Sequence, residues 1–362
     1  MKTLTWQKPG QQNVAQELIK IIINYVAELR LMNEKVPLVS VVVPNYNYAR
    51  YLDARLTSIL NQTFQDFELI LLDDASTDNS LEILDKYKNN LHVSHLVVNE
   101  QNTGSPFKQW MKGILLAKGE WIWIAEADDL CESTFLETCV EQVQKYSNIS
   151  VCMTASKYID ENGRILPQEA NYWGKNKPAV SACRFPGKAY AEHNMYWNNC
   201  VINASGVLFR RSYAINLFDS SFVNMRYSGD WVFWFQMLLQ GDMFEIYAQL
   251  NKFRQHTAKV SVEGVRLGNR IKEDIDVLFL MEKTFPEMKK YKRRLAHGMI
   301  YRKIKKVNDA DKRIELSRYL SERLGGKASD LRLFHLNKYL RFICPWLVTI
   351  KRDRLKLYDY IW

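Results

Sequence analysis

The chain of 362 residues is long for a single hydrophobic core, so one large domain with additions, or two domains, is expected. Hydrophobic residues make up 47% and charged residues 25% of the sequence, a balance that excludes disordered and fibrous proteins. The net charge of +10 comes from the C-terminal part, because residues 265–362 carry 25 Lys+Arg against 12 Asp+Glu. This asymmetry indicates either an anionic partner for that region or a solvated basic helical face.

The cysteines and the apolar runs favour a cytoplasmic protein. Six cysteines show neither a CxxC pair nor regular spacing, which argues against a zinc site or a disulfide framework. The N-terminal sequence MKTLTWQKPGQQ lacks the features of a signal peptide. Since no apolar run approaches the roughly 20 residues that span a bilayer, we expect any membrane contact to be peripheral, on the inner face.

Residues 12–32 carry apolar side chains on one helical stripe and predict an N-terminal helix. Strand and helix patterns then alternate with short links, which predicts a doubly wound α/β domain. The expected strands are 38–46, 67–76, 92–100 and 120–129, and the expected helices are 50–62, 76–87 and 105–119.

Beyond residue 150 the pattern is less regular. Residues 151–165 predict a strand and turn, residues 203–217 a strand and helix, and residues 229–241 a buried helix. From residue 265 the chain is mostly helical and basic. We therefore divide it into an N-terminal helical extension (1–37), an α/β domain (38–264) and a helical basic region (265–362).

Polar residues gather where the predicted strands end, in the segments PNYN, DDAS, NEQNTG and EADD. In open α/β sheets the ligand lies beyond the carboxyl ends of the strands. Two of these segments are acidic, with Asp73 and Asp74 after one strand and Asp128 and Asp129 after another. Carboxylates there suit Mg2+ or Mn2+ with substrate phosphates, or hydrogen bonds to a base or ribose. A solvated sheet edge is the alternative.

Three common sites are absent from the sequence. It contains no GxxxxGK[ST] loop, no GxGxxG after the first strand and no GxSxG elbow. The remaining possibility is a phosphorylated ligand held by a metal and by side chains.

Five segments together resemble the inverting family-2 glycosyltransferases of the GT-A fold. They are VSVVVPNYNYARYL, LILLDDASTDNS, NEQNTG, LLAKGEWIWIAEADDL and NASGVLFRRS, in the family's order, and the resemblance covers residues 38–261. It implies a Rossmann-like domain with a mixed, mainly parallel sheet, a nucleotide-sugar donor such as a UDP-sugar, and Mn2+ or Mg2+ as cofactor.

The resemblance also implies roles for the strand-end residues. Pro44 and Tyr46 match the segment that lines the nucleobase. Asp74 matches the acid that meets the uracil, with Asp73 beside it at the same edge. Lys108, four residues after a glycine at the start of a helix, is a candidate diphosphate contact.

The segment Glu126-Ala127-Asp128-Asp129 matches the DxD-like element, with Glu where the family often has Asp. In that element one acid faces the ribose and another coordinates the metal. We assign Asp128 to the ribose and Asp129 to the metal.

The resemblance places the catalytic base and a further ligand later in the chain. Asp230, in RYSGDWVFWF, matches the acid that takes the acceptor proton, although the usual preceding Glu is missing. As an alternative, Asp230 is only the cap of a buried helix. In KFRQHTAKVS, Arg254 is a candidate phosphate contact and His256 a candidate metal ligand.

The sequence thus predicts a transferase that moves a sugar to a hydroxyl of a glycan or lipid-linked acceptor, in the synthesis of a surface polysaccharide, lipopolysaccharide or glycoconjugate. The QxxRW motif of processive synthases is absent, so we expect the addition of one or a few sugars. A non-catalytic partner subunit of the same fold, docked through its basic tail, is the alternative. The basic tail mixes Trp, Phe and Leu with Lys and Arg and predicts contact with anionic lipid. It shows no nucleic-acid reader motif, so no nucleic-acid partner is expected.

Overall fold

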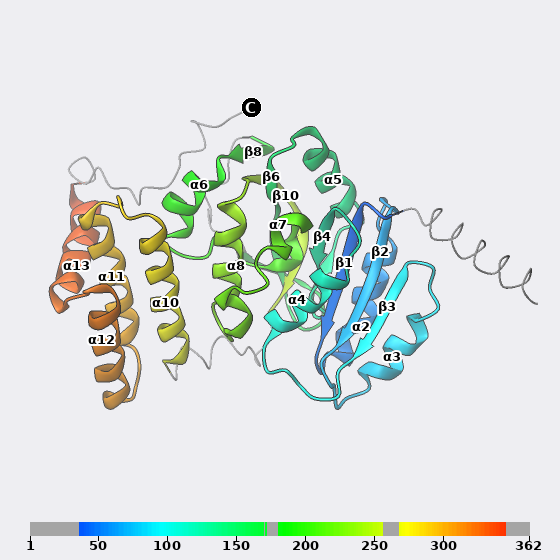
Figure 1. The fold of residues 1–362 in the computed structure, drawn as a ribbon, viewed down its shortest axis with the longest axis horizontal. Coiled ribbons are helices and arrows are strands. Elements are labelled where there is room, and N and C mark those ends of the chain that lie inside the picture. The colour runs from blue at the N-terminus through cyan, green and yellow to red at the C-terminus, as the bar shows by residue number, and fades with distance from the viewer. Residues whose placement is uncertain (1–35, 170, 172–179, 256–267, 345–362) are drawn as a thin grey trace, which may run out of the picture. The chain divides into compact units, whose positions relative to one another are not determined.

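The structure is a computed structural model and describes residues 36–169, 171, 180–255 and 268–344 (Figure 1). The helix expected over residues 12–32, the predicted ligand His256 and the predicted domain boundary at 264/265 lie outside these ranges. From Leu38 onwards the chain forms one compact unit.

The first half of this unit alternates strand and helix, as the sequence predicts. Its elements are β1 (Val39–Asn45), α2 (Ala49–Leu60), β2 (Phe67–Asp73), α3 (Ser80–Tyr87), β3 (Val93–Val98), α4 (Pro106–Leu116) and β4 (Trp121–Ile124). The β-branched and aliphatic runs of β1 and β2 are buried along their whole length, which is typical of strands covered on both faces.

The next segment extends the sheet and adds short helices. Its elements are β5 (Leu130–Cys131), α5 (Phe135–Lys145), β6 (Ile149–Ile159), β7 (Ile165–Glu169), β8 (Ala182–Phe185), α6 (Gly187–Tyr190), η1 (Ala191–Met195), η2 (Ala204–Gly206), β9 (Val207–Arg210), α7 (Arg211–Ile215), η3 (Ser221–Asn224), α8 (Gly229–Leu238) and β10 (Asp242–Arg254). The strand and helix predicted over residues 203–217 and the buried helix predicted from residue 229 are both present.

Ten strands of the described residues form one mixed sheet, whose main path runs β3-β2-β1-β4-β9-β6-β10-β5. Strand β1 pairs in parallel with β2 on one side and with β4 on the other, and β3 continues the parallel set. The strand order therefore reverses at β1. A reversal of this kind leaves a crevice at the carboxyl ends of the two strands, where α/β proteins bind ligands.

Alternate side chains of the strands fill two hydrophobic layers, one on each face of the sheet. Val41 and Val43 of β1 pack in the layer formed with α2 and α5, whereas Val42 packs in the layer formed with α4 and α8. The second layer continues into the C-terminal helices through residues such as Ile271 and Ile275. The two layers and the parallel and antiparallel strand pairings thus confirm the predicted α/β class with a mixed sheet.

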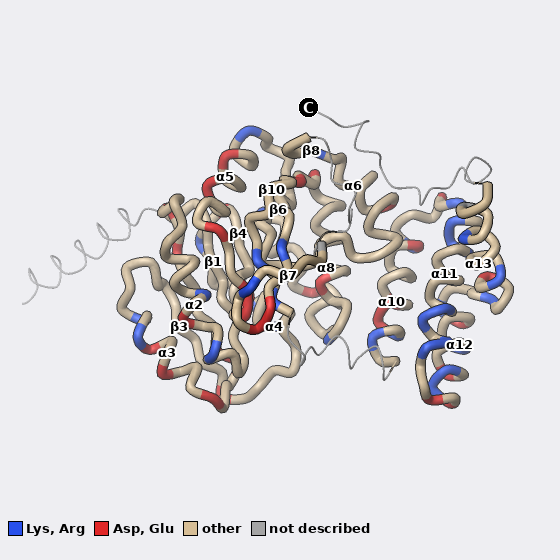
Figure 2. Tube along the Cα trace, turned by 180° about the vertical axis from the view of Figure 1, so that it is seen from behind, with Lys and Arg blue, Asp and Glu red and all other residues tan. Residues whose placement is uncertain are grey.

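The C-terminal region is helical, as predicted. It comprises α10 (Asn269–Thr284), α11 (Lys290–Ile304), α12 (Ala310–Leu324) and α13 (Ala328–Ile343). Lys and Arg recur along these helices (Figure 2). None of the helices in the described ranges has the length and hydropathy needed to cross a bilayer. The first of the four, α10, lies between α8 and the other three helices (Figure 1), and its buried residues belong to the same hydrophobic layer as those of α8.

Candidate functional site

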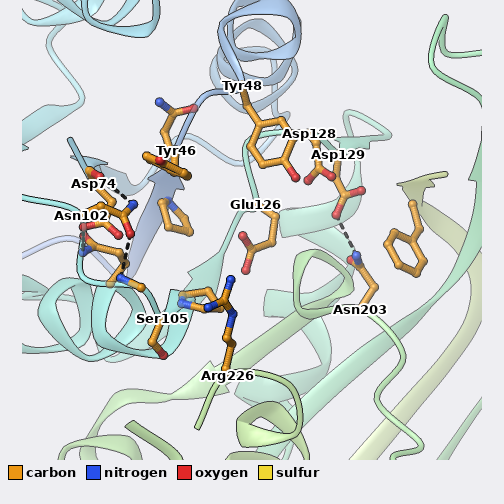
Figure 3. Close-up of a pocket in the computed structure, with 16 residues that line it drawn as sticks. Tyr46, Tyr48, Asp74, Asn102, Ser105, Glu126, Asp128, Asp129, Asn203 and Arg226 are labelled. Atoms are coloured by element: carbon orange, nitrogen blue, oxygen red, sulfur yellow. Dashed lines mark hydrogen bonds between the residues drawn. The ribbon is translucent and has the colours of Figure 1, made fainter. Parts of the chain in front are cut away.

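A cavity of about 470 Å3 lies at the carboxyl ends of β1, β2 and β4, where the strand order reverses (Figure 3). It is lined by Pro44, Asn45, Tyr46, Tyr48, Asp74, Asn102, Gly104, Ser105, Pro106, Gln109, Glu126, Asp128, Asp129, Asn203, Arg226 and Phe253. Five of the residues selected from the sequence therefore come together here: Pro44, Tyr46, Asp74, Asp128 and Asp129.

The loop after β1 supplies one wall of the cavity. Pro44 belongs to β1, and Tyr46, just beyond its end, is 44% exposed and presents its ring to the cavity (Figure 3). Asn47, the next residue, has a left-handed φ of 58° that is uncommon for a residue other than glycine. Its side chain accepts the Thr77 backbone N–H at 2.7 Å, so the loop after β2 holds this strained backbone in place.

The two acids at the end of β2 differ in their surroundings. Asp73 does not line the cavity; it is fully buried and accepts hydrogen bonds from Asn45 at 2.7 Å and from the Ser76 hydroxyl at 2.7 Å. Asp73 therefore ties β1 to the loop after β2, and its predicted donor contact stays a prediction. Asp74 does line the cavity.

The carboxylate of Asp74 is itself surrounded by protein donors. Its oxygens accept hydrogen bonds from Asn99 at 2.6 Å, from Gln109 at 2.8 Å and from the Thr103 hydroxyl at 2.8 Å. Asp74 therefore shapes the rim of the cavity by fixing the segment that follows β3.

The three acids that follow β4 have distinct environments. Glu126 accepts a hydrogen bond from the Trp110 indole at 2.8 Å, and burial together with the charge of Asp128 raises its pKa to about 8. Asp129 is 1% exposed, whereas Asp128 is partly exposed at the cavity. Burial, followed by the charge of Asp128, raises the pKa of Asp129 to about 6.

Both oxygens of Asp129 accept hydrogen bonds from the protein. The Ser205 hydroxyl and the Asn203 amide donate to Oδ2 at 2.7 and 2.8 Å, and the Arg254 backbone N–H donates to Oδ1 at 2.9 Å. These bonds connect the end of β4 to η2 and β10. Three of the roughly four lone-pair sites of the Asp129 carboxylate thus face protein donors. Asp129 also lines the cavity, and its assignment as the metal ligand stays a prediction.

The environment of Arg254 also differs from the one expected of a phosphate contact. It is 3% exposed and does not line the cavity. Its Nε donates to the Asp128 carbonyl at 2.6 Å, and its Nη1 donates to the carbonyls of Asp160 and Glu161. The guanidinium therefore fixes the backbone that carries Asp128. The side chain of β10 that lines the cavity is Phe253, its neighbour.

A second arginine near the acids, Arg55 of α2, was not selected from the sequence. Its side chain is fully buried, and its guanidinium lies 4.9 Å from the centroid of the Trp123 ring. The positive charge of Arg55 lowers the pKa values of Glu126 and Asp129. Arg55 is the buried countercharge for the acidic strand end. The amphipathic pattern of α2 predicted a helix but not this role of one of its residues.

The lining residues of the cavity include the cation Arg226, which the sequence analysis also did not select. It stands in the loop between η3 and α8, and its guanidinium points toward Glu126 (Figure 3). Lys108, the predicted diphosphate contact, is exposed and does not line the cavity; its ammonium donates to the Thr103 carbonyl at 3.3 Å. Arg226 is therefore the better placed cation.

Asp230, the predicted base, is the second residue of α8 and follows the same loop. Its carboxylate accepts hydrogen bonds from the Asn199 amide at 2.9 Å and from the Trp231 N–H at 2.8 Å. Burial raises its pKa to about 6, although the charge of Arg270 opposes this shift. Asp230 does not itself line the cavity, but only three residues separate it from Arg226.

Residues 40–218 match the family model described as "Glycosyl transferase family 2". This match includes β1, β2, β4 and all the acids that follow them. Through these residues the chain belongs to glycosyl transferase family 2. The remaining part of the cavity, with Arg226 and Phe253, and the predicted base Asp230 lie beyond the matched segment.

Relatives of this family-2 chain include glycosyltransferases from several bacteria. Glycosyltransferase GlyG of Streptococcus pneumoniae is 43% identical over 111 residues, which are 30% of this chain and 36% of GlyG. The poly(ribitol-phosphate) beta-N-acetylglucosaminyltransferase TarS of Staphylococcus aureus is 35% identical over 133 residues, which are 36% of this chain and 22% of TarS. The matches thus span about a third or less of these relatives.

A solved structure supports the fold. The crystal structure of S. aureus TarS 1-349 in complex with UDP-GlcNAc aligns with a TM-score of 0.51 at 18% identity, and the alignment covers 86% of this chain and 76% of that one. At this identity the likeness establishes the GT-A fold of the family-2 chain.

Mn2+ or Mg2+ is the cofactor expected from the sequence analysis. No group of three His, Cys, Asp or Glu side chains in the described part of the chain is arranged to hold a metal alone. The chemistry of the site nevertheless fits a hard cation, because Mg2+ is commonly held by one or two carboxylates together with substrate phosphates. Glu126 and Asp128 line the cavity and carry such oxygens.

Proposed function

We propose that this family-2 chain is a metal-dependent inverting glycosyltransferase. It moves a hexosyl or N-acetylhexosaminyl group from a UDP-sugar donor to a hydroxyl of a glycan or lipid-linked acceptor. One observation supports this reaction above all: an aromatic wall, an acidic strand end and a cation, represented by Tyr46, Asp128 and Arg226, line a single cavity at the point where the strand order reverses.

The donor fits this cavity by its chemistry. The ring of Tyr46 and the neighbouring Pro44 offer an apolar wall for a nucleobase, and the Arg226 guanidinium suits a diphosphate. A divalent cation bound with Asp128, and with Glu126 beside it, would neutralise the departing diphosphate. The relative TarS is described as bound to UDP-GlcNAc, which supports UDP as the nucleotide.

In the proposed reaction the carboxylate of Asp230 accepts the proton of the acceptor hydroxyl. The oxygen forms a bond to the anomeric carbon as the bond from that carbon to the diphosphate breaks, and the nucleoside diphosphate leaves. A base is effective when its pKa lies close to the working pH, and the raised pKa of Asp230, about 6, suits this role. The hydrogen bond from Asn199 orients the carboxylate.

In this proposal the basic helical region brings the protein to a membrane-bound acceptor. The last turns of α13 expose Leu336, Tyr339 and Phe342, and the region from residue 265 has a net charge of +13. Exposed apolar side chains beside Lys and Arg are typical of helices that lie on anionic lipid. We therefore place the protein on the inner face of the cytoplasmic membrane, where a lipid-linked acceptor in the synthesis of a surface polysaccharide, lipopolysaccharide or glycoconjugate would reach it.

A panel of UDP-sugars, tested with Mn2+, with Mg2+ and with a chelator, tests the function. Slow donor hydrolysis or transfer with at least one sugar is expected, dependent on the metal and lost in Asp230→Asn. A donor-induced rise in melting temperature is expected alongside, because a ligand that binds only the native state stabilises it. A protein that neither binds nor turns over any donor of the panel is not this enzyme. Binding without turnover, unaffected by Asp230→Asn, would favour the non-catalytic subunit.

A further inference from the structure

The loop from Arg226 to Ser228 connects the cavity with the predicted base. Arg226 lines the cavity, Ser228 is the N-cap residue of α8, and Asp230 follows in the first turn of that helix. A shift of this loop would therefore move a cavity cation and the base together.

The backbone of this loop is held by a carboxylate from outside the family-2 segment. Glu273 of α10 accepts three consecutive backbone N–H groups: that of Arg226 at 2.9 Å with Oε1, and those of Tyr227 at 2.8 Å and Ser228 at 2.7 Å with Oε2. Hydrogen bonds to an ionised acceptor are roughly twice as strong as neutral ones. One side chain thus fixes the course of the whole loop.

The residue after Glu273 fixes the helix that carries the base. Asp274 is 2% exposed and accepts the Ser228 hydroxyl at 2.8 Å with Oδ1 and the Lys303 ammonium at 2.7 Å with Oδ2. Arg270, one turn earlier on α10, acts electrostatically on Asp230. The first half of α10 therefore contacts the loop and the N-cap residue of α8, and it acts electrostatically on the base.

We infer that Glu273 is a positioning residue for the transfer reaction, which acts through the Arg226–Ser228 loop on the donor cation and the base. The helical region beyond the family-2 segment then forms part of the transfer machinery, in addition to any role in docking. This inference rests on the proposed function for the meaning of Arg226 and Asp230. Its geometric part, the hold of Glu273 on the loop, does not.

Hydrogen exchange tests the geometric part. In Glu273→Gln one of the two acceptor oxygens is replaced by a donor that faces backbone N–H groups, so the amides of residues 226–228 should exchange at least about tenfold faster. Asp276→Asn is the matched control: Asp276 lies one turn along α10, and its Oδ1 accepts the Tyr319 hydroxyl at 2.6 Å, away from the loop. Equal exchange in the wild type and both variants would overturn the inference.

A double-mutant cycle tests the functional part with UDP and Mn2+ as probe. Arg226→Gln is expected to weaken UDP binding by about tenfold, the loss of one charge-assisted hydrogen bond. If Glu273 acts through Arg226, Glu273→Gln weakens UDP binding in the wild type but adds nothing in the Arg226→Gln background. The inference would be contradicted if the two substitutions weakened UDP binding independently, so that the loss in the double variant was the product of the two single losses.

The two tests also separate this inference from the proposed function. A wild-type protein that shows no UDP binding overturns the proposed function, and the exchange experiment then decides the positioning role alone. Melting temperatures of all variants identify unfolding. Should Glu273→Gln fail to fold, Glu273→Asp keeps the charge on a shorter arm and is expected to shift exchange and UDP binding in the same directions, by smaller factors.

Discussion

The Ser205 hydroxyl donates a hydrogen bond of 2.7 Å to Oδ2 of Asp129. Together with the bonds from Asn203 and from the Arg254 backbone, it joins the ends of β4, η2 and β10 through one buried carboxylate. Both Asp129 and the adjacent acid, Asp128, line the cavity, and Asp128 is the more exposed of the two. The two neighbouring aspartates therefore differ in their surroundings: Asp129 holds the strand ends together, and Asp128 is the more exposed of the two at the cavity.

This difference predicts opposite phenotypes for two isosteric substitutions. Asp128→Asn should abolish the Mn2+-dependent part of UDP binding with little change in melting temperature, because it removes a charge at the cavity. Asp129→Asn should lower the free energy of unfolding by about 1–3 kcal/mol, because an amide nitrogen would face donors that now lack an acceptor. Denaturant unfolding and UDP titration with and without Mn2+ measure both effects.

The reverse pattern would restore Asp129 as the principal metal ligand: loss of Mn2+ dependence in Asp129→Asn at unchanged stability, with Asp128→Asn still metal-dependent. Asn203→Ala is a useful companion variant, since it removes one donor to Asp129 and leaves every carboxylate in place.

The pH dependence of transfer should report the Asp230 carboxyl. Burial raises its pKa to about 6, so the group is ionised and competent as a base above pH 6 and protonated below. We expect kcat/KM to fall about tenfold per pH unit below 6, and Asp230→Asn to lose about 100- to 10,000-fold in kcat. A pH profile that stays flat down to pH 5 would exclude Asp230 as the base.

The substitution Arg270→Gln tests the electrostatic control of the Asp230 pKa. Arg270 and Asp274 of α10 are the charged groups whose effects on Asp230 oppose each other, Arg270 lowering and Asp274 raising its pKa. Without Arg270 the ionised form of Asp230 is less stable, so its pKa rises and the acid limb of the profile moves to higher pH. Asp276→Asn on the same helix should leave the limb in place.

The sequence predicted the strands and their acidic ends well, because buried parallel strands have a distinctive pattern. It assigned Asp128 to the ribose and Asp129 to the metal, but it gave no sign that Asp129 accepts hydrogen bonds from η2 and β10, because those donors are distant in the sequence. The sequence analysis did not select Arg226 and Glu273, for a similar reason. One lies in a loop without a motif and the other on an amphipathic helix, and their relation arises from the packing of α10 against the loop before α8.

Arg226 lines the cavity and Lys108 does not, which predicts different effects on UDP binding when each is substituted. Arg226→Gln should weaken UDP binding and reduce its dependence on salt, because it removes a charge that faces the cavity. Lys108→Gln should change neither by more than about twofold, because the Lys108 ammonium is exposed and directed at the Thr103 carbonyl. UDP titrations between low and high ionic strength distinguish the two. Equal losses in both variants would return Lys108 to the list of donor contacts.

The last turns of α13 should carry binding to anionic membranes. Phe342 is 89% exposed, and Leu336 and Tyr339 are more than half exposed on the same helix. The triple variant Leu336→Gln, Tyr339→Gln and Phe342→Gln should lose co-sedimentation with phosphatidylglycerol vesicles, whereas the wild type should bind them and release at high salt. Leu91→Gln, at a fully exposed leucine of the α/β domain, is the control and should bind as the wild type does. Retention of the triple variant on the vesicles, or equal binding of the wild type to neutral phosphatidylcholine, would refute a lipid role for this helix.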